Sequence, residues 1–265
     1  MKCSTSYDYY AYICKQITTK QSMIHIKLPN TNQHKLSFYL AMEEYVAETL
    51  TTDDDCFFLW QVKPTVIFGR HQVIENEVNL NYCRENGIEV YRRKSGGGCV
   101  YADNNNVMLS YITRSDNVEK TFSRYLALVA EALQSILGIE TVKTHNNDLL
   151  IDGAKVSGNA IYHTNGKIIA HGTLLYDTVM QNMTSAITPS QEKLQKHGVE
   201  SVRQRITLLK QHTTMPLEEI KSQLISHICS SEHQLNDADV TKIKAIEAEY
   251  LDPGFIANGN TGKLR

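Results

Sequence analysis

A run of three glycines preceded by three cations is the first feature of the sequence with obvious chemical potential. It reads Arg92-Arg93-Lys94-Ser95-Gly96-Gly97-Gly98. Consecutive glycines cost backbone entropy, but they let backbone N–H groups approach an anion closely, and nearby cations favour that approach. The alternative is a flexible turn between two strands, which has no need of three clustered cations. The run matches neither common phosphate loop, G-x-x-x-x-G-K-[ST] or G-x-G-x-x-G, so we expect an anion-binding loop over a sheet.

A polar cluster on two expected strands is the second such feature. Period 2 puts Lys155, Ser157 and Asn159 on one strand face, with the small Gly158 among them. A lysine directly after a hairpin turn is usually a solvated charge, and sharing a face with polar neighbours argues for a site instead. The next strand carries His171-Gly172-Thr173, where a histidine is more often structural than functional. The pattern predicts a polar site across two neighbouring strands.

The elements that must position these residues follow from hydrophobic periodicity. Strands are expected at 57–62, 65–68, 88–92, 107–113, 147–151, 154–161 and 168–176, with a first strand opening at Met23. Because Asp152-Gly153 and Asn165-Gly166 are strong hairpin turns, the last three strands should form a consecutive antiparallel unit.

Helices are expected at 35–50, with Leu36, Leu40, Tyr45 or Val46 and Leu50 on one apolar stripe, and at 118–137, ended by Gly138. The stretch from about 190 to 250 is helical by pattern, with Pro216 at a start and 252–254 as a stop. Hairpins interrupted by one long helix and followed by helices indicate an α+β domain, not a doubly wound nucleotide fold.

Composition excludes several classes of function. The 265-residue chain has 27 Lys plus Arg and 29 Asp plus Glu, a net charge of −2, which argues against nucleic acid as the main partner. No apolar run is long enough to span a bilayer, and residues 1–22 lack the pattern of a secretory signal. The six cysteines lack the spacing of a disulfide framework or a zinc site, so we expect reduced thiols in the cytoplasm.

Taken together, four motifs resemble the lipoate–protein ligase family. They are RRKSGGGCVYAD, NNDLLIDGAKVSGNAIY, HGTLLYD and KLQKHGVESVRQRITLL, in the family's order between about Ser37 and Leu209. The resemblance implies a mixed, largely antiparallel sheet flanked by helices, like class II aminoacyl-tRNA synthetases and biotin ligases. It also implies a catalytic domain at 23–252 and a C-terminal tail at 253–265 without the accessory domain of larger ligases. Because the clean strand pattern opens only at Met23, we expect residues 1–22 to be an N-terminal extension outside the core, with an extra helix packed outside the core as the alternative.

The resemblance implies roles for individual residues as well. Lys155 matches the family's essential lysine, which contacts the acyl carboxylate and the α-phosphate. Residues expected to bind the acyl-adenylate or line its pocket are Arg93, Ser95, Gly96, Gly97, Gly98, Cys99, Tyr101, Gly158, Asn159, Ala160, His171 and Thr173. Residues expected near the nucleotide and Mg²⁺ are Arg70, Asn106, Asn147 and Asp148, with Asp148 as the metal ligand.

The expected activity is ATP-dependent ligation of lipoate, or octanoate, through an acyl-AMP intermediate to a lysine of a carrier. The family implies ATP and Mg²⁺ as cofactors. It implies lipoyl domains of 2-oxoacid dehydrogenase complexes or the glycine-cleavage H protein as partners, with a separate accessory protein as a further possibility and no role for nucleic acid or membrane.

The sequence departs from the family pattern in three ways. Ala102 stands where many relatives have a histidine, and Cys99 follows the glycines, where we interpret it as a small core residue rather than a nucleophile. The missing accessory domain leaves a lipoyltransferase that uses preformed lipoyl-AMP. Octanoyl transfer by a cysteine is disfavoured because 141–146 contains none; biotin ligation and a non-catalytic lipoate-binding module are further alternatives.

Overall fold

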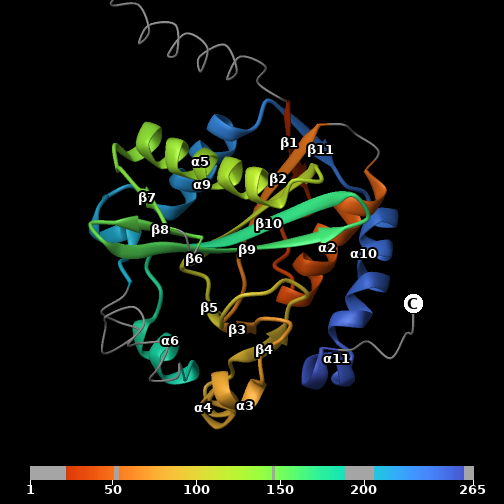
Figure 1. Cartoon of the computed structure of the whole chain (residues 1–265). Helices are drawn as coiled ribbons and strands as arrows, with labels where there is room; N and C mark the ends of the chain where they lie inside the picture. The colour runs from red at the N-terminus through yellow and green to blue at the C-terminus, as the bar shows by residue number, and fades with distance from the viewer. Residues whose placement is uncertain (1–21, 51–53, 145–146, 189–205, 260–265) are drawn as a thin grey trace, which may run out of the picture.

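The computed structural model describes residues 22–50, 54–144, 147–188 and 206–259, which form one large and one small sheet covered by helices (Figure 1). The large sheet has eight strands in the order β11-β1-β2-β6-β10-β9-β8-β7, and the small sheet has the order β4-β3-β5. Strand β1 runs parallel to its neighbours β2 and β11, whereas the other neighbours in the large sheet are antiparallel. The predicted α+β class, with a mixed and largely antiparallel sheet, is confirmed.

The strands are β1 (Met23–Lys27), β2 (Asp55–Trp60), β3 (Thr65–Phe68), β4 (Glu89–Arg92), β5 (Val100–Ala102), β6 (Asn106–Arg114), β7 (Val142–Lys143), β8 (Asp148–Ile151), β9 (Ala154–Thr164), β10 (Lys167–Leu175) and β11 (Ser231–Gln234). The helices are α2 (Leu36–Thr49), α3 (Ile74–Glu77), α4 (Leu80–Glu85), α5 (Val118–Leu137), α6 (Met180–Ala186), α9 (Leu217–Ile228), α10 (Asp237–Tyr250) and α11 (Pro253–Asn258), with a 3₁₀ turn η1 (Leu209–Gln211). None of these helices is both long and apolar enough to cross a membrane.

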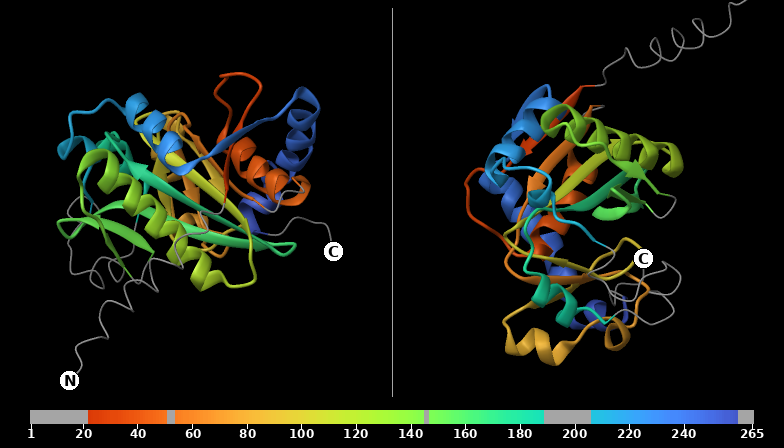
Figure 2. Two further views of the ribbon diagram at one scale, coloured as in Figure 1. Left: turned by 90° about the horizontal axis from the view of Figure 1, so that it is seen from above. Right: turned by 90° about the vertical axis from the view of Figure 1, so that its left-hand side faces the viewer.

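Helices cover both faces of the large sheet (Figure 2). On one face, α5 and α9 pack on apolar side chains such as Phe57 and Leu109. On the other face, α2 packs on side chains such as Phe58 and Ile169 and is itself backed by α10. A third apolar cluster joins the small sheet to α4 and α6. The other side of the small sheet, with Ile67 and Tyr91, belongs to the α2 cluster, so the small sheet lies beside the α2 face of the large one.

The three consecutive strands expected from the hairpin turns are β8, β9 and β10. Both central residues of each turn have positive φ, 49° and 80° at Asp152-Gly153 and 47° and 71° at Asn165-Gly166. Such values are those of the type I′ turn that Asp-Gly and Asn-Gly favour. Helix α5 also ends where expected, at Gly138 with φ 68°. These elements confirm the prediction.

Helix α2 differs from the expected one-sided stripe. All residues from Leu36 to Ala47 are buried, including the carboxylates Glu43 and Glu44. The helix is covered on one side by the sheet and on the other by α10, so no solvent face is left. The predicted apolar stripe therefore accounts for only part of the buried surface of this helix.

The C-terminal third also differs from the expectation. Residues 189–205 of the expected helical stretch lie outside the described residues; α9, which follows Pro216 directly, and α10 confirm two of the expected helices. Between them, β11 pairs with β1 as an edge strand. Its sequence, SEHQ, is polar and all four residues are exposed, so hydrophobic periodicity gives no signal for it.

Part of the expected C-terminal tail is a helix. Asp252 caps α11 by accepting a hydrogen bond from the Phe255 amide at 2.9 Å. The Phe255 side chain is 1% exposed and packs on Tyr250. Residues 253–258 therefore pack on the core, and the Asp-Pro-Gly run both stops α10 and starts α11.

Candidate active site

A β-bulge decides which side chains of β9 can form a site. Val156 and Ser157 fall where β8 shifts register, so the two strands do not pair residue for residue past Leu149. A bulge re-aims the side chains beyond it. Lys155 therefore lies on the α2 face of the sheet, whereas Ser157 and Asn159 face α5. The prediction that all three share one face is wrong, because the period of 2 does not continue through a bulge.

Lys155 is held beside a carboxylate from the neighbouring strand. Its Nζ lies 2.8 Å from Oδ1 of Asp148, and the two side chains are 22% and 8% exposed. A Cβ added at Gly158 would lie 2.5 Å from both Cε and Nζ of Lys155, so only glycine lets the lysine lie along the sheet here. Asn147, with φ 67°, turns the chain into β8 just before Asp148. Lys155, predicted to contact the acyl carboxylate and the α-phosphate, and Asp148, predicted to lie near the nucleotide and Mg²⁺, are thus in direct contact.

The glycine loop connects β4 to β5 and is braced from within. Gly96, Gly97 and Gly98 are exposed. Beneath them, the Arg93 guanidinium donates to the carbonyls of Gly96 and Gly98, each at 2.7 Å. Burial lowers the pKa of Arg93 to about 10, so it stays charged at neutral pH. A Cβ at Gly69 would overlap the Gly97 carbonyl oxygen, so this close approach also requires glycine.

The other two cations of the run, Arg92 and Lys94, bind groups outside the glycine loop. Arg92 donates to five carbonyl oxygens, among them those of Arg70, Ile256 and Ala257 at 2.6 to 2.9 Å. Lys94 pairs with Glu44 at 2.7 Å and with Glu249 at 3.1 Å. The interpretation that clustered cations imply a bound anion is therefore wrong for these two residues, which tie the small sheet to α2, α10 and α11.

A buried line of hydrogen bonds joins the glycine loop to the large sheet. Ser95 Oγ lies 2.8 Å from Nε2 of His171, and Nδ1 of His171 lies 2.8 Å from Glu43. Glu43 also accepts from Ser110 at 2.5 Å, and Ser110 accepts from the Trp60 indole at 2.8 Å. The predicted residues Ser95 and His171 are in direct contact across the two sheets.

Glu43 is a residue of this line that the sequence analysis did not identify. The sequence did contain a signal for it. Glu43 follows Leu36 and Leu40 at helical spacing, so a carboxylate occupies the apolar stripe of the predicted helix. A buried carboxylate needs partners, which His171 and Ser110 supply.

Tyr101, predicted to bind the acyl-adenylate, and Asn106, predicted to lie near the nucleotide, have side chains that contact other parts of the fold than Lys155 and the glycine loop. The Tyr101 side chain is 1% exposed and lies in the apolar cluster of the small sheet, where its hydroxyl accepts from Asn182 at 3.3 Å. Asn106, at the start of β6, donates to Thr178 at 3.1 Å. Its Oδ1 is buried and has no hydrogen-bond partner within the described part of the chain.

The remaining predicted residues surround the two strands and the loop. Ala160 is paired with His171 across β9 and β10. Thr173 is buried and donates to the Met108 sulfur at 3.2 Å. Arg70 is exposed, and its amide donates to the Ser95 carbonyl at 3.0 Å. Burial raises the pKa of the Cys99 thiol to about 12, which keeps it protonated and agrees with a core residue rather than a nucleophile.

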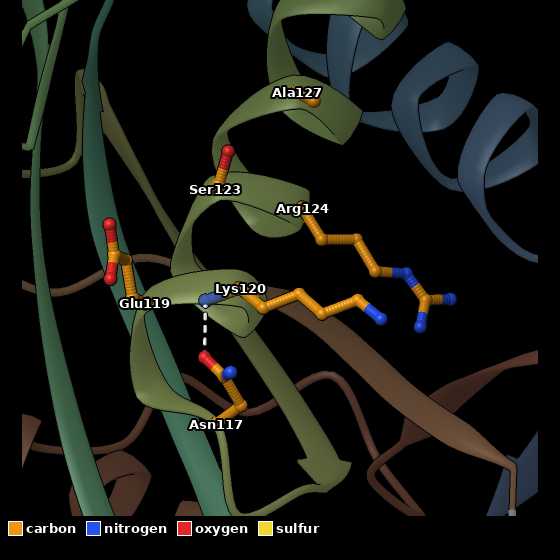
Figure 3. Close-up of a pocket in the computed structure, with 6 residues that line it drawn as sticks. All are labelled: Asn117, Glu119, Lys120, Ser123, Arg124 and Ala127. Carbon is orange, nitrogen blue, oxygen red and sulfur yellow. Dashed lines mark hydrogen bonds between the residues drawn. The ribbon is translucent and has the colours of Figure 1, made fainter. Parts of the chain in front are cut away.

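Figure 3 shows a depression outside this constellation. It is lined by Asn117, Glu119, Lys120, Ser123, Arg124 and Ala127, on the N-terminal half of α5. The Asn117 side chain caps the helix by accepting from the Lys120 amide at 2.8 Å. Arg124 is engaged with the buried Asp55 at 3.0 Å. None of the predicted site residues lines it.

Comparison with protein families gives the class to which this fold and site belong. The family model of the lipoyl protein ligase A/B catalytic domain matches residues 35–229, and the chain belongs to this family. It is 34% identical over 237 residues to the lipoate-protein ligase LplJ of Bacillus subtilis, covering 86% of this chain and 71% of the relative. It is 33% identical over 226 residues to lipoate–protein ligase 1 of Staphylococcus aureus, covering 83% and 69%. The family predicted from the motifs is confirmed.

Solved structures share the fold. A bi-partite lipoate protein ligase from Thermoplasma acidophilum, studied with its E2 lipoyl domain, has a TM-score of 0.78 at 20% identity and covers 92% of this chain and 100% of its own. LipL1 of P. falciparum in complex with lipoate has a TM-score of 0.75 at 20% identity, with 92% and 76% covered. Lipoate-protein ligase A bound with ATP has a TM-score of 0.74 at 21% identity, with 89% and 98% covered.

Proposed function

We propose that this chain is a lipoate–protein ligase that activates lipoate, or octanoate, with ATP and transfers the acyl group to a lysine of a carrier protein. One observation carries the proposal. The hydrogen bond between Ser95 and His171 holds the glycine loop against the sheet face that bears Lys155 and Asp148. Relatives with this fold bind lipoate and ATP.

The first half-reaction is attack of the acyl carboxylate on the α-phosphorus of ATP. A phosphorus–oxygen bond forms to the carboxylate, the bond to pyrophosphate breaks, and a mixed anhydride with AMP results. Negative charge grows on the phosphate oxygens, which a fixed cation and fixed N–H donors stabilise. Lys155 supplies the cation, and the exposed backbone of Gly96 to Gly98 supplies the donors.

Asp148 is the residue that we propose for Mg²⁺. No group of three His, Cys, Asp or Glu side chains suited to a metal occurs among the described residues. A single carboxylate nevertheless fits Mg²⁺, which usually binds one or two carboxylates together with substrate phosphates and water. When bound, the ion would supply charge neutralisation at the phosphates. Asp148 and Lys155, 2.8 Å apart, would then present opposite charges to one nucleotide.

The second half-reaction is attack of the carrier's neutral lysine amine on the acyl carbonyl. The carbon–oxygen bond to AMP breaks, an amide forms, and one proton leaves the nitrogen. Lys155 stabilises the departing phosphate. No nucleophilic side chain of the enzyme is required, in keeping with the raised pKa of Cys99. Octanoyl transfer through a cysteine is correspondingly disfavoured.

The proposed carriers are lipoyl domains of 2-oxoacid dehydrogenase complexes and the glycine-cleavage H protein. The first is supported by the Thermoplasma acidophilum ligase that was studied with its E2 lipoyl domain. A separate accessory protein and a cytoplasmic location belong to the same proposal. The four cysteines among the described residues are free thiols, as a reducing compartment would have them.

The experiment that tests the proposal replaces Lys155 by alanine and measures lipoyl-AMP formation. Removal of one transition-state contact of this kind costs on the order of 10²- to 10³-fold in rate. Lys143, exposed on the edge strand β7, provides the matched control, because Lys143→Ala removes a lysine nearby in the sheet without touching the site. If Lys155→Ala formed lipoyl-AMP as fast as Lys143→Ala, the mechanism would be wrong.

A further inference from the structure

Asn159 lies on the face of the sheet opposite Lys155, although it belongs to the same motif. Its side chain is surrounded by groups of the α5 face: the Tyr125 hydroxyl, the Ser157 hydroxyl and the backbone of Asn147. A Cβ at Gly172 on the adjacent strand would overlap the Asn159 amide. The amide therefore fills a space formed for it, away from the face on which Lys155 and Asp148 meet.

The hydrogen bonds fix which way the amide points. Asn159 Nδ2 lies 3.0 Å from the carbonyl oxygen of Asn147. A carbonyl oxygen only accepts, so the NH₂ group must face Asn147. The amide oxygen then accepts from the Tyr125 hydroxyl at 3.1 Å. Both ends of the amide are thus assigned by their partners.

The carbonyl that Asn159 holds belongs to a backbone position that needs support. Asn147 has φ 67°, in the left-handed region that non-glycine residues seldom adopt. Its amide donates to the Thr144 carbonyl at 3.2 Å. The next residue is Asp148, whose carboxylate lies 2.8 Å from Lys155 Nζ. The turn at Asn147 therefore aims the Asp148 side chain toward Lys155.

We propose that Asn159 is a positioning residue for adenylate formation. Through its bond to the Asn147 carbonyl it fixes the turn that presents Asp148 beside Lys155, and it does not contact the acyl group or the nucleotide. This inference rests on the proposed function. It replaces the acyl-pocket role that the resemblance implied for Asn159 with one that acts through the backbone.

The two half-reactions depend differently on this support. Adenylate formation uses Asp148 at the phosphates of ATP, together with Lys155. Transfer from lipoyl-AMP uses Lys155, whose side chain packs over Gly158 of the same strand and does not depend on the turn at Asn147. Loss of the Asn159 bond should therefore slow the first half-reaction and spare the second.

The test is Asn159→Asp, an isosteric change that leaves an acceptor facing the Asn147 carbonyl. Lipoate-dependent ATP–pyrophosphate exchange should fall by about tenfold or more, because small misplacements of reacting groups cost factors of this size. Transfer from added lipoyl-AMP to a lipoyl domain should keep the wild-type rate. Asn159→Ala, which buries no new charge, carries the same test if the aspartate variant does not fold.

The matched control is Ser157→Ala. Ser157 is fully buried in the same cluster and its hydroxyl lies 3.2 Å from the Asn159 amide nitrogen, but the side chain that donates to the Asn147 carbonyl is that of Asn159. Its removal should leave exchange and transfer unchanged. A second readout is the double variant with Asp148→Asn. If Asn159 acts through Asp148, then Asn159→Ala should cause no further loss of exchange in that background.

Several results would overturn the inference: exchange at the wild-type rate in both Asn159 variants, equal losses in exchange and transfer, or losses that multiply in the double variant. A failure of the proposed function is distinguishable from these outcomes. In that case the wild-type chain itself would show no lipoate-dependent exchange, before any variant is compared.

Discussion

Gly158→Ala should separate activity from stability more cleanly than any other single change in the site. The added Cβ would lie 2.5 Å from Cε and Nζ of Lys155, whereas carbon atoms pack at about 3.5–4.0 Å. The end of the lysine side chain must therefore move by about 1 Å or more. Since it is flexible, it can move without disturbing the backbone, but it then leaves its place beside Asp148.

We expect Gly158→Ala to lower the reaction rate strongly and to leave the free energy of unfolding almost unchanged. A misplacement of about 1 Å costs roughly 10²-fold in rate, or about 2.7 kcal/mol of activation free energy. The side chains of Lys155 and Asp148 are 22% and 8% exposed, and a shift of about 1 Å weakens their ion pair without leaving the carboxylate unpaired, so the cost is about 1 kcal/mol of folding stability. Replacing a strand glycine by alanine returns roughly 0.5–1 kcal/mol. The free energy of unfolding should therefore hardly change.

The assay is lipoate-dependent exchange of pyrophosphate into ATP, with the thermal midpoint measured on the same preparation. The double variant Gly158→Ala with Lys155→Ala is the control. If the alanine acts by displacing the lysine, the double variant should be no slower than Lys155→Ala alone. A folded Gly158→Ala protein that exchanges at the wild-type rate would refute the claim that Lys155 works from its observed position.

Three further perturbations test the loop, its anchor and the thiol beside it. Gly69→Ala should abolish exchange in a folded protein, since its Cβ would overlap the Gly97 carbonyl and shift the loop; unchanged exchange would show that the loop position does not matter. Arg92→Lys replaces a five-donor guanidinium by a point charge and should lower the free energy of unfolding by about 2–3 kcal/mol, measured by urea denaturation; an unchanged midpoint would contradict the role of its carbonyl contacts. Burial raises the pKa of Cys99 to about 12, so the folded state holds the thiol proton more tightly than the unfolded state. Its contribution to stability is present below the ordinary thiol pKa of about 8.5 and is lost as the pH rises toward 12. Cys99→Ala should therefore flatten the alkaline fall in the thermal midpoint while exchange persists, and inactivation by this change would point to a nucleophilic role.

The hairpin turns and the end of helix α5 were predictable because they depend on the backbone preferences of a few neighbouring residues. The turns at Asp152-Gly153 and Asn165-Gly166 require positive φ, and the residue types alone determine this. The strands on either side followed from their apolar runs. The glycine-ended helix α5 followed for the same reason, because Gly138 relieves the cost of the left-handed cap.

Features set by pairing across the fold were not predictable in this way. The bulge in β9 depends on how β8 is registered against it, and it moved Lys155 to the face opposite Ser157. The sequence predicted that Arg92 and Lys94 attract an anion, whereas in the fold they bind carbonyl and carboxylate groups from distant parts of the chain. In each case the outcome depends on a residue or strand far away in the sequence, which local sequence patterns do not identify.

The most direct test of the central claim is lipoate-dependent ATP–pyrophosphate exchange by the purified chain alone. We expect exchange that requires lipoate and a divalent cation and that is lost in Lys155→Ala. The absence of exchange in the wild-type chain, with efficient transfer from added lipoyl-AMP to a lipoyl domain, would contradict this expectation and make the protein a lipoyltransferase instead.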